Sequence, residues 1–293
     1  MAGPSKEHTD VIDAARVDLP VGIFDSGVGG LTVLRALRET LPQENYLYLG
    51  DTARVPYGTR SPETVRRYAR QASRLLFERG IKALVVACNT ASAAAITALR
   101  EDHPDTLVEG VIEPGARAAL DATRTGRIAV IATEGTVQGG AYPRTVNALR
   151  DGVSVEQRAC SLLVALAEEG WIDGPVVAGA LERYFDGLFE ADGADVLLLG
   201  CTHFPVLSDA IRATVPSHVQ LVDSAATTAA VVARDLAARK LLRANGHGEV
   251  HYLVTDNVAR FERTAARFLG AAPGHARIEL VDLNEGRETE RQS

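Results

Sequence analysis

The sequence predicts an α/β protein with two pseudo-symmetric domains, each built around a mainly parallel β-sheet. Short runs of β-branched residues and leucine alternate with longer amphipathic stretches, which is the pattern of βα units. The chain has 293 residues, enough for roughly two domains of ~100–200 residues each. A weak internal repeat also gives the two halves of the chain the same order of motifs.

Eight short apolar runs are expected to be strands, and the longer stretches between them are expected to be helices. In chain order these strands are 21–25, 45–51, 83–88, 107–112, 127–133, 194–201, 219–224 and 250–255. One helix has readable ends, because Ser61 is suited to the N-cap, Pro62 to the first helical position and Gly80 to the stop.

Charge and composition exclude several classes of protein. The net charge is −7 and the arginines are scattered among acids, so there is no basic stripe for a nucleic acid. Residues 1–20 lack the features of a signal peptide, and no window reaches the ~18 apolar residues of a membrane span. We therefore expect a cytoplasmic protein. Residues 1–20 form a short polar leader, which is either flexible or a regulatory contact.

The internal repeat places a cysteine at the same point in each half. VGIFDSGVGG and RIAVIATEGT open the halves, and each half later reaches a strand that ends on cysteine, in LVVACNTAS and LLLGCTHFP. Ligands bind at such strand ends in open α/β sheets. Pseudo-symmetry can thus bring Cys88 and Cys201 to face each other across one cleft.

Both cysteines are expected where a strand turns into a helix, with Pro205 the first helical residue after Cys201. Unpaired N–H groups at a helix N-terminus favour a thiolate and can also hold a carboxylate. The alternatives are that each cysteine is a small core residue, as we expect for Cys160, or that Cys88, Cys201 and His203 bind a metal. Neither a CxxC nor an HExxH cluster supports a metal site.

Two opposed thiols suit the inversion of an amino acid at its α-carbon. One thiolate removes the α-proton while the other thiol returns a proton to the opposite face. A racemase that used pyridoxal phosphate would need a Schiff-base lysine. The chain has only Lys6, Lys82 and Lys240, and none of them is expected at a strand end. We therefore expect catalysis without a cofactor.

The glycine-rich turn in FDSGVGGLTV is not a nucleotide site. Thr32 stands where the third glycine of GxGxxG belongs, and no Gly-Lys-Ser/Thr follows. The glycines are expected to allow close approach of the backbone at the cleft. Asp25 can assist Cys88 or bind an ammonium group, with Ser26 as a hydrogen-bond donor, or it can simply cap a helix. By composition alone, Tyr57-Gly58 is a turn that can offer N–H groups to an anion.

Four long motifs together resemble the glutamate racemases of bacterial cell-wall synthesis. They are GIFDSGVGGLTV (22–33), YLGDTARVPYGTRS (48–61), VVACNTASA (85–93) and LGCTHFPVL (199–207). The resemblance implies cofactor-independent interconversion of L- and D-glutamate, the D-isomer being a peptidoglycan precursor. It also implies an active site between two domains, 21–113 with 224–293 and 114–223, and a homodimer.

The resemblance also implies roles for individual residues. Cys88 would be the base towards D-glutamate, assisted by Asp25, and Cys201 the base towards L-glutamate, assisted by His203. A further family acid falls on Glu168 or its neighbour Glu169, since Ser161 and Ala165 replace the prolines that usually mark this stretch. The residues that would bind substrate are Asp25, Ser26, Tyr57, Gly58, Asn89, Thr90, Thr202 and His203.

Two other functions stay open at this point. A relative of the same superfamily could act on another acid such as aspartate. The chain could also be a regulatory protein that holds an acidic ligand in the same cleft without turning it over. Retention of both thiols, Asp25 and His203 favours catalysis, because binding alone needs neither thiol.

Overall fold

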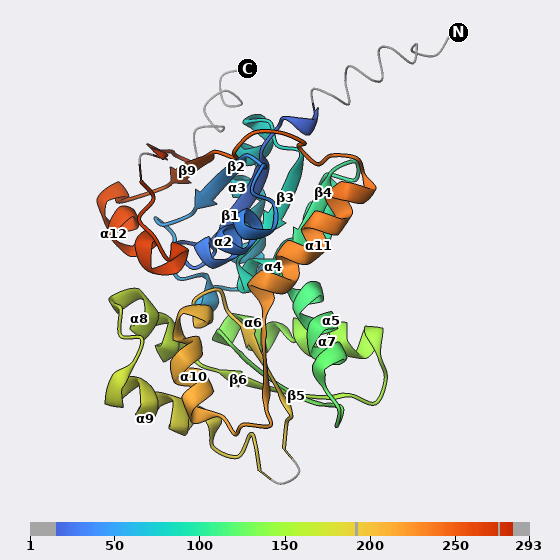
Figure 1. Cartoon of the computed structure of the whole chain (residues 1–293), viewed down its shortest axis with the longest axis vertical. Helices are drawn as coiled ribbons and strands as arrows, with labels where there is room; N and C mark the ends of the chain where they lie inside the picture. The colour runs from blue at the N-terminus through green and yellow to red at the C-terminus, as the bar shows by residue number, and fades with distance from the viewer. Residues whose placement is uncertain (1–15, 191–192, 275, 284–293) are drawn as a thin grey trace.

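The computed structural model describes residues 16–190, 193–274 and 276–283, which form two α/β domains stacked one above the other (Figure 1). Each domain has its own β-sheet, and every strand pair in both sheets is parallel. This confirms the predicted fold class.

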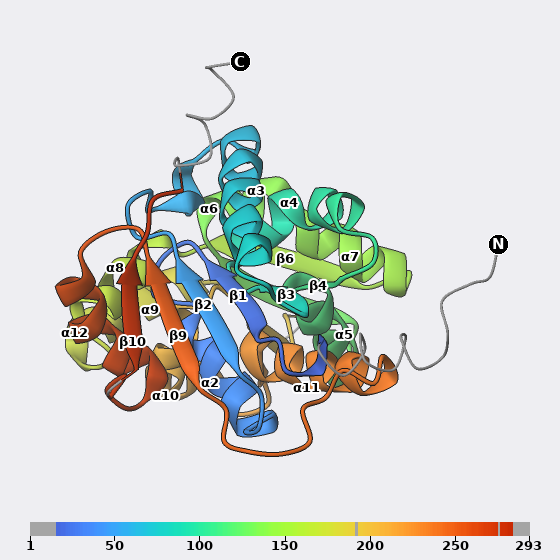
Figure 2. The same cartoon turned by 90° about the horizontal axis from the view of Figure 1, so that it is seen from above.

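The first domain contains a six-stranded sheet in the order β10-β9-β2-β1-β3-β4. Its strands, in that order, are Arg277–Leu280, Val250–Val254, Tyr46–Gly50, Val21–Asp25, Ala83–Val86 and Leu107–Gly110. Helices α3 (Pro62–Glu78) and α4 (Asn89–Asp102) cover one face, and α2 (Leu31–Thr40), α11 (Ser224–Ala238) and α12 (Val258–Leu269) cover the other (Figure 2). The sheet thus combines strands from both ends of the chain.

The second domain contains a four-stranded sheet in the order β6-β5-β7-β8. Its strands are Ser154–Ala159, Arg127–Ala132, Val196–Gly200 and Gln220–Asp223. The helices between β4 and β8 are α5 (Ile112–Ala122), α6 (Glu134–Gly139), α7 (Ala141–Leu149), α8 (Ser161–Glu169), α9 (Gly174–Phe185) and α10 (Ser208–Thr214). Two short 3₁₀ helices, η1 (Tyr57–Thr59) and η2 (Phe204–Leu207), complete the described elements.

Strands β1, β2, β3 and β7 are buried along their whole length, as expected for parallel strands covered by helices on both faces. The signals at the ends of α3 are confirmed. The Ser61 side chain accepts a hydrogen bond from Thr64 N, Pro62 begins the helix, and Gly80 has the left-handed φ of 77° that follows its end.

Several predicted elements were wrong or missed. Residues 107–112 do not form one strand, because β4 stops at Gly110 and Ile112 already begins α5. The helix expected after Cys201 is only the 3₁₀ helix η2, with α10 beginning at Ser208. Strands β6 and β10 were not predicted, since both are partly exposed edge strands with polar residues.

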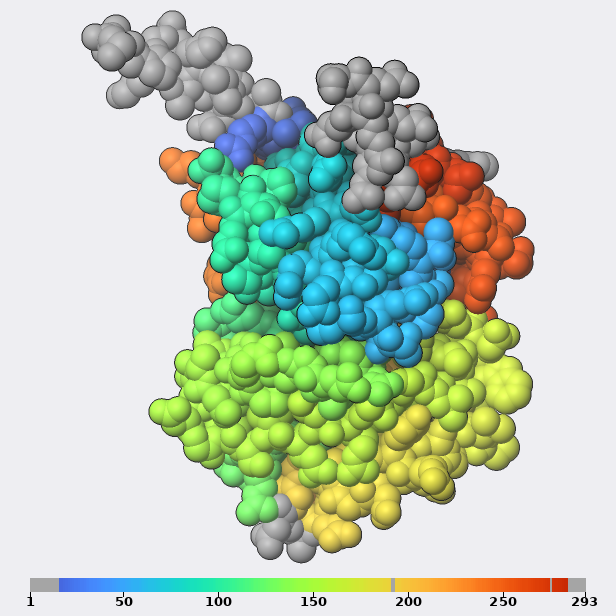
Figure 3. Space-filling model, turned by 180° about the vertical axis from the view of Figure 1, so that it is seen from behind, coloured from blue at the N-terminus to red at the C-terminus, as the bar shows by residue number. Residues whose placement is uncertain are grey.

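The domains meet along one continuous boundary when the molecule is seen from behind (Figure 3). Thr32 Oγ1 of the first domain donates a hydrogen bond to the Thr202 carbonyl of the second, at 3.1 Å. The domain limits 21–113 with 224–293 and 114–223 stay a prediction. Residues 1–15 of the predicted leader lie outside the described residues. Among the described helices, none has the length and apolar character needed to cross a membrane.

Candidate active site

Asp25 is the last residue of β1, and its side chain is fully buried. Gly27 N donates to Asp25 Oδ2 at 2.9 Å, and the Tyr48 hydroxyl lies 3.5 Å from the same oxygen. Within the described part of the chain, Asp25 Oδ1 is buried with no hydrogen-bond partner. Burial raises the pKa of Asp25, opposed by the charge of His203 and by backbone N–H groups of the turn. Asp25 thus has one carboxylate oxygen that caps the turn and a second buried oxygen that can accept a further hydrogen bond.

Cys88 follows β3 and is the N-cap residue of α4, where Ala91 N donates to its sulfur at 3.4 Å. Burial raises the pKa of Cys88 to about 12, and the charge of Asp25 acts in the same direction. Hydrogen bonds from Ser26 and Ala91 N act in the opposite direction. The helix N-terminus therefore does not by itself yield a thiolate here, because desolvation outweighs it.

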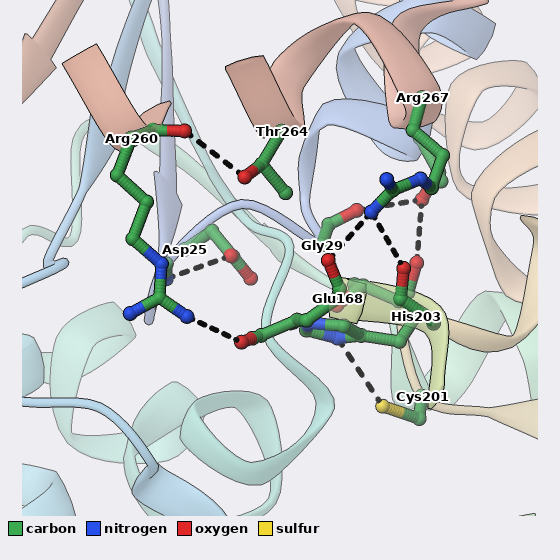
Figure 4. A network of polar contacts seen from close by, with 12 residues as sticks. Asp25, Gly29, Glu168, Cys201, His203, Arg260, Thr264 and Arg267 are labelled. Carbon is green, nitrogen blue, oxygen red and sulfur yellow. Dashed lines mark hydrogen bonds and ion pairs between the residues drawn. The ribbon is translucent and has the colours of Figure 1, made fainter. Parts of the chain in front are cut away.

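Cys201 follows β7 in the second domain and begins a row of three side chains in contact, Cys201, His203 and Glu168, which we call the relay (Figure 4). Its Sγ lies 3.8 Å from His203 Nδ1, and His203 Nε2 lies 3.1 Å from Glu168 Oε1. Burial alone would lower the pKa of His203, but hydrogen bonds to Cys201 and Glu168 raise it to about 10. The imidazole is therefore positively charged at neutral pH, between the Glu168 carboxylate and the sulfur of Cys201.

Of the two acids left open by the sequence, Glu168 contacts His203, whereas the neighbouring Glu169 is exposed. The hydrogen bond to His203 lowers the pKa of Glu168, burial opposes this, and Arg260 assists it. Glu168 is on α8, which the second domain places beside the turn after β7.

Both cysteine side chains are buried, and a charge on Cys201 would raise the pKa of Cys88. Gly29 of the first domain lies close against His203 of the second, and only the absence of a side chain allows this, because a Cβ on it would lie 2.5 Å from His203 Nδ1. The predicted close approach of the glycine-rich turn is thus confirmed.

Of the other predicted residues, Asn89, Thr90 and Gly58 contact the second domain, whereas the Tyr57 hydroxyl bonds within the first. Asn89 Nδ2 donates to the Tyr142 hydroxyl at 2.8 Å, while Asn89 Oδ1 is buried without a partner among the described residues. The Thr90 hydroxyl lies 2.9 Å from that of Thr133. The Tyr57 hydroxyl donates to Asp51, and Thr133 packs against the backbone at Gly58.

Comparison with protein-family profiles matches residues 30–232 to the family described as Asp/Glu/Hydantoin racemase. The chain belongs to this racemase family. A protein of Geobacter metallireducens named glutamate racemase is 52% identical over 255 residues, which cover 87% of this chain and 94% of that protein.

Solved structures give the same result. The glutamate racemase of Thermus thermophilus in complex with β-chloro-D-alanine has a TM-score of 0.83 and 44% identity, covering 92% of this chain and 99% of its own. That of Francisella tularensis in complex with D-glutamate has a TM-score of 0.85 and 32% identity, with coverage of 92% and 99%. The chain is therefore an enzyme, a racemase of the isomerase class.

Sequence reasoning on this racemase missed Thr133 and Tyr142, which the second domain contributes to the junction. Thr133 follows β5 as Ser26 follows β1, so the internal repeat was a usable signal for it. Tyr142 is inside α7, and its hydroxyl lies 3.3 Å from that of Ser224. No motif marks Tyr142.

Across the described residues, no group of three or more His, Cys, Asp or Glu could hold a metal ion.

Proposed function

We propose that the racemase interconverts L- and D-glutamate by direct proton transfer at the α-carbon between Cys88 and Cys201, without a cofactor. One observation supports this most directly. Each cysteine is buried near ionisable side chains: the charge of Asp25 acts on Cys88, and His203, which contacts Glu168, lies beside Cys201. The relatives named glutamate racemase support glutamate as the substrate.

In the direction from L-glutamate, the Cys201 thiolate removes the α-proton and becomes a thiol. The electron pair of the broken C–H bond stays on the α-carbon and is delocalised into the α-carboxylate. The S–H of Cys88 then gives its proton to the opposite face and becomes a thiolate, which yields D-glutamate. The reverse direction uses the same residues with exchanged roles, and His203 and Asp25 return the protons between turnovers.

The electrostatics of the two thiols suit this scheme. The pKa of Cys88, raised to about 12, keeps it a thiol at neutral pH, which is the form that must donate a proton to the carbanion. The charged His203 imidazole, 3.8 Å from Cys201, stabilises negative charge on that sulfur. In this proposal the free enzyme therefore has the Cys88 thiol that the direction from L-glutamate requires.

Unpaired acceptors at the junction suit the substrate ammonium group. Asp25 Oδ1 and Asn89 Oδ1 are both buried without a described partner, and an ammonium group offers three donors to such oxygens. The hydroxyls of Thr90 and Thr202 and N–H groups at Ser26 and the Tyr57-Gly58 turn would bind the carboxylates. These donors also stabilise the charge that moves onto the α-carboxylate in the transition state.

The proposed product defines a wider role. D-glutamate made by this enzyme in the cytoplasm would supply peptidoglycan synthesis, and so cell-wall biogenesis and cell shape.

We further propose a homodimer that binds neither nucleic acid nor membrane. Light scattering of the purified chain checks the dimer, and a mass near the 31.2 kDa of one chain would contradict it.

The test is proton NMR of L-glutamate in D₂O with the purified protein and no added cofactor. Loss of the α-proton signal together with formation of D-glutamate is expected. Exchange with aspartate in place of glutamate would assign a sister activity of the family. No exchange with either acid would overturn the proposal and favour a ligand-binding role.

A further inference from the structure

Helix α12 of the first domain reaches across to the acid of the second domain. Arg267 Nη1 donates to the carbonyls of Ala167 and Glu168, at 3.0 and 2.5 Å. Both carbonyls belong to the last turn of α8, where backbone oxygens lack helical partners and the helix dipole favours a cation. Arg267 therefore caps the helix end that carries Glu168.

The Arg267 guanidinium also lies close to the backbone of Gly170, the residue that ends α8. Gly170 ends α8 with a left-handed φ of 84°, and a Cβ on it would lie 2.7 Å from Arg267 Cζ. Only a glycine lets the guanidinium lie so near the turn. By contrast, Arg263 on the same helix is exposed.

Two further residues of α12 contact the same relay (Figure 4 shows the polar contacts). Arg260 Nη2 lies 3.5 Å from Glu168 Oε2, and the Phe268 ring packs edge-on against the His203 ring with centroids 5.2 Å apart. The neighbours of Cys88 are different, because they are Asp25 at the end of β1, Ser26 in the turn after it and Ala91 N in the first turn of α4. Helix α12 thus makes these polar contacts with the partners of Cys201, whereas on the Cys88 side its Phe261 ring packs 6.2 Å from the ring of Tyr48, the residue whose hydroxyl lies near Asp25.

We infer that Arg267 is a positioning residue, which holds the end of α8 so that Glu168 keeps its hydrogen bond to His203 and the relay serves Cys201. The inference rests on the proposed function, since it takes Cys201 as the base towards L-glutamate. Substitution of Arg267 then slows proton transfer at Cys201 more than transfer at Cys88.

Isotope effects separate the two thiols. The enantiomers have equal free energies, so kcat/KM must be equal in both directions for every variant. In Arg267→Met, kcat/KM should fall about tenfold, the size expected when one charge-assisted hydrogen bond near the reacting groups is lost. The isotope effect on kcat/KM should rise with L-[2-²H]glutamate and fall with D-[2-²H]glutamate, because removal of the L α-proton becomes slower.

Two variants serve as controls in the full-length chain. Arg267→Lys keeps a cation at the end of α8 and should recover part of the lost kcat/KM. Arg263→Met removes an exposed arginine from the same helix and should behave as wild type. A fall in kcat/KM for Arg267→Met with both isotope effects unchanged would overturn the inference and leave Arg267 a purely structural contact.

Alkylation provides a readout that needs no glutamate. Cys88 and Cys201 are 5% and 6% exposed, so iodoacetamide has comparable access to both. Arg267→Met should lower the alkylation rate of Cys201 relative to Cys88 several-fold, because a displaced Glu168 holds the His203 charge less well beside Cys201. Equal rates of change at both cysteines would contradict the inference. A wild-type protein inert towards glutamate would refute the proposed function alone.

Discussion

Gly29 is the position where a single methyl group should separate the two halves of the site. It lies in the turn after β1, against the second domain. A Cβ there would overlap Thr202 Oγ1 and lie 2.5 Å from His203 Nδ1, whereas ordinary contacts begin at 3.4 Å. In Gly29→Ala, the turn and the His203 ring must therefore move apart by about 1 Å, and a misplacement of this size can cost about 100-fold in rate.

We expect kcat of Gly29→Ala to fall about 100-fold while the protein still folds. The overpacking should cost about 1–3 kcal/mol of unfolding free energy, since neither Thr202 nor the imidazole is a flexible chain end. Polarimetry of L-glutamate conversion measures the rate, and urea titration measures stability. Wild-type kcat in Gly29→Ala would refute the close contact on which the site geometry depends.

Gly179 provides the matched control. It lies inside α9 and is exposed, and an added methyl group there would meet no atom within 4 Å. Gly179→Ala should leave kcat unchanged and raise the unfolding free energy by about 0.5–1 kcal/mol, because glycine is the poorer helix former. A loss of activity in this variant would show that added methyl groups act non-specifically.

Two further predictions concern stability. The buried Lys82 ammonium contacts Glu44 Oε2 at 2.5 Å and the carbonyls of Val17 and Leu241, so Lys82→Met should cost about 3–5 kcal/mol by stranding Glu44. Urea titration should show partial recovery when Glu44→Gln is added, and no recovery would exclude a stranded charge. The pKa of His203, about 10 when folded against 6.5 ordinarily, makes its stabilisation complete below pH 6.5 and lost as pH rises towards 10. Unfolding free energy should fall over this range more in wild type than in His203→Gln, and parallel curves would contradict the assigned charge.

The strands that end at the site could be predicted because each is a continuous apolar run closed by a chemically distinctive residue. Asp25 ends β1 as predicted, and Cys88 lies two residues beyond the end of β3 rather than inside the strand; both strands are fully buried. The edge strand β6 could not be found in this way. Its sequence SVEQRA is polar and partly exposed, so it carries neither an apolar run nor a clear alternation.

Contacts between distant segments explain what the site prediction lacked. Nothing in the sequence near Glu168 indicates that Arg267 caps its helix, since the two residues are 99 positions apart and meet only when the domains pack. Glu168 and Glu169 were likewise equivalent by spacing. The rotation of α8 towards His203 distinguishes them, and that rotation depends on tertiary packing.

The most direct test of the two-thiol scheme is to give each enantiomer of glutamate separately to Cys88→Ala and Cys201→Ala in D₂O. The scheme predicts that neither variant forms the opposite enantiomer. Cys88→Ala should exchange only the α-proton of L-glutamate, and Cys201→Ala only that of D-glutamate, because each retains one base. Racemisation by either variant at the wild-type rate would contradict proton transfer between Cys88 and Cys201.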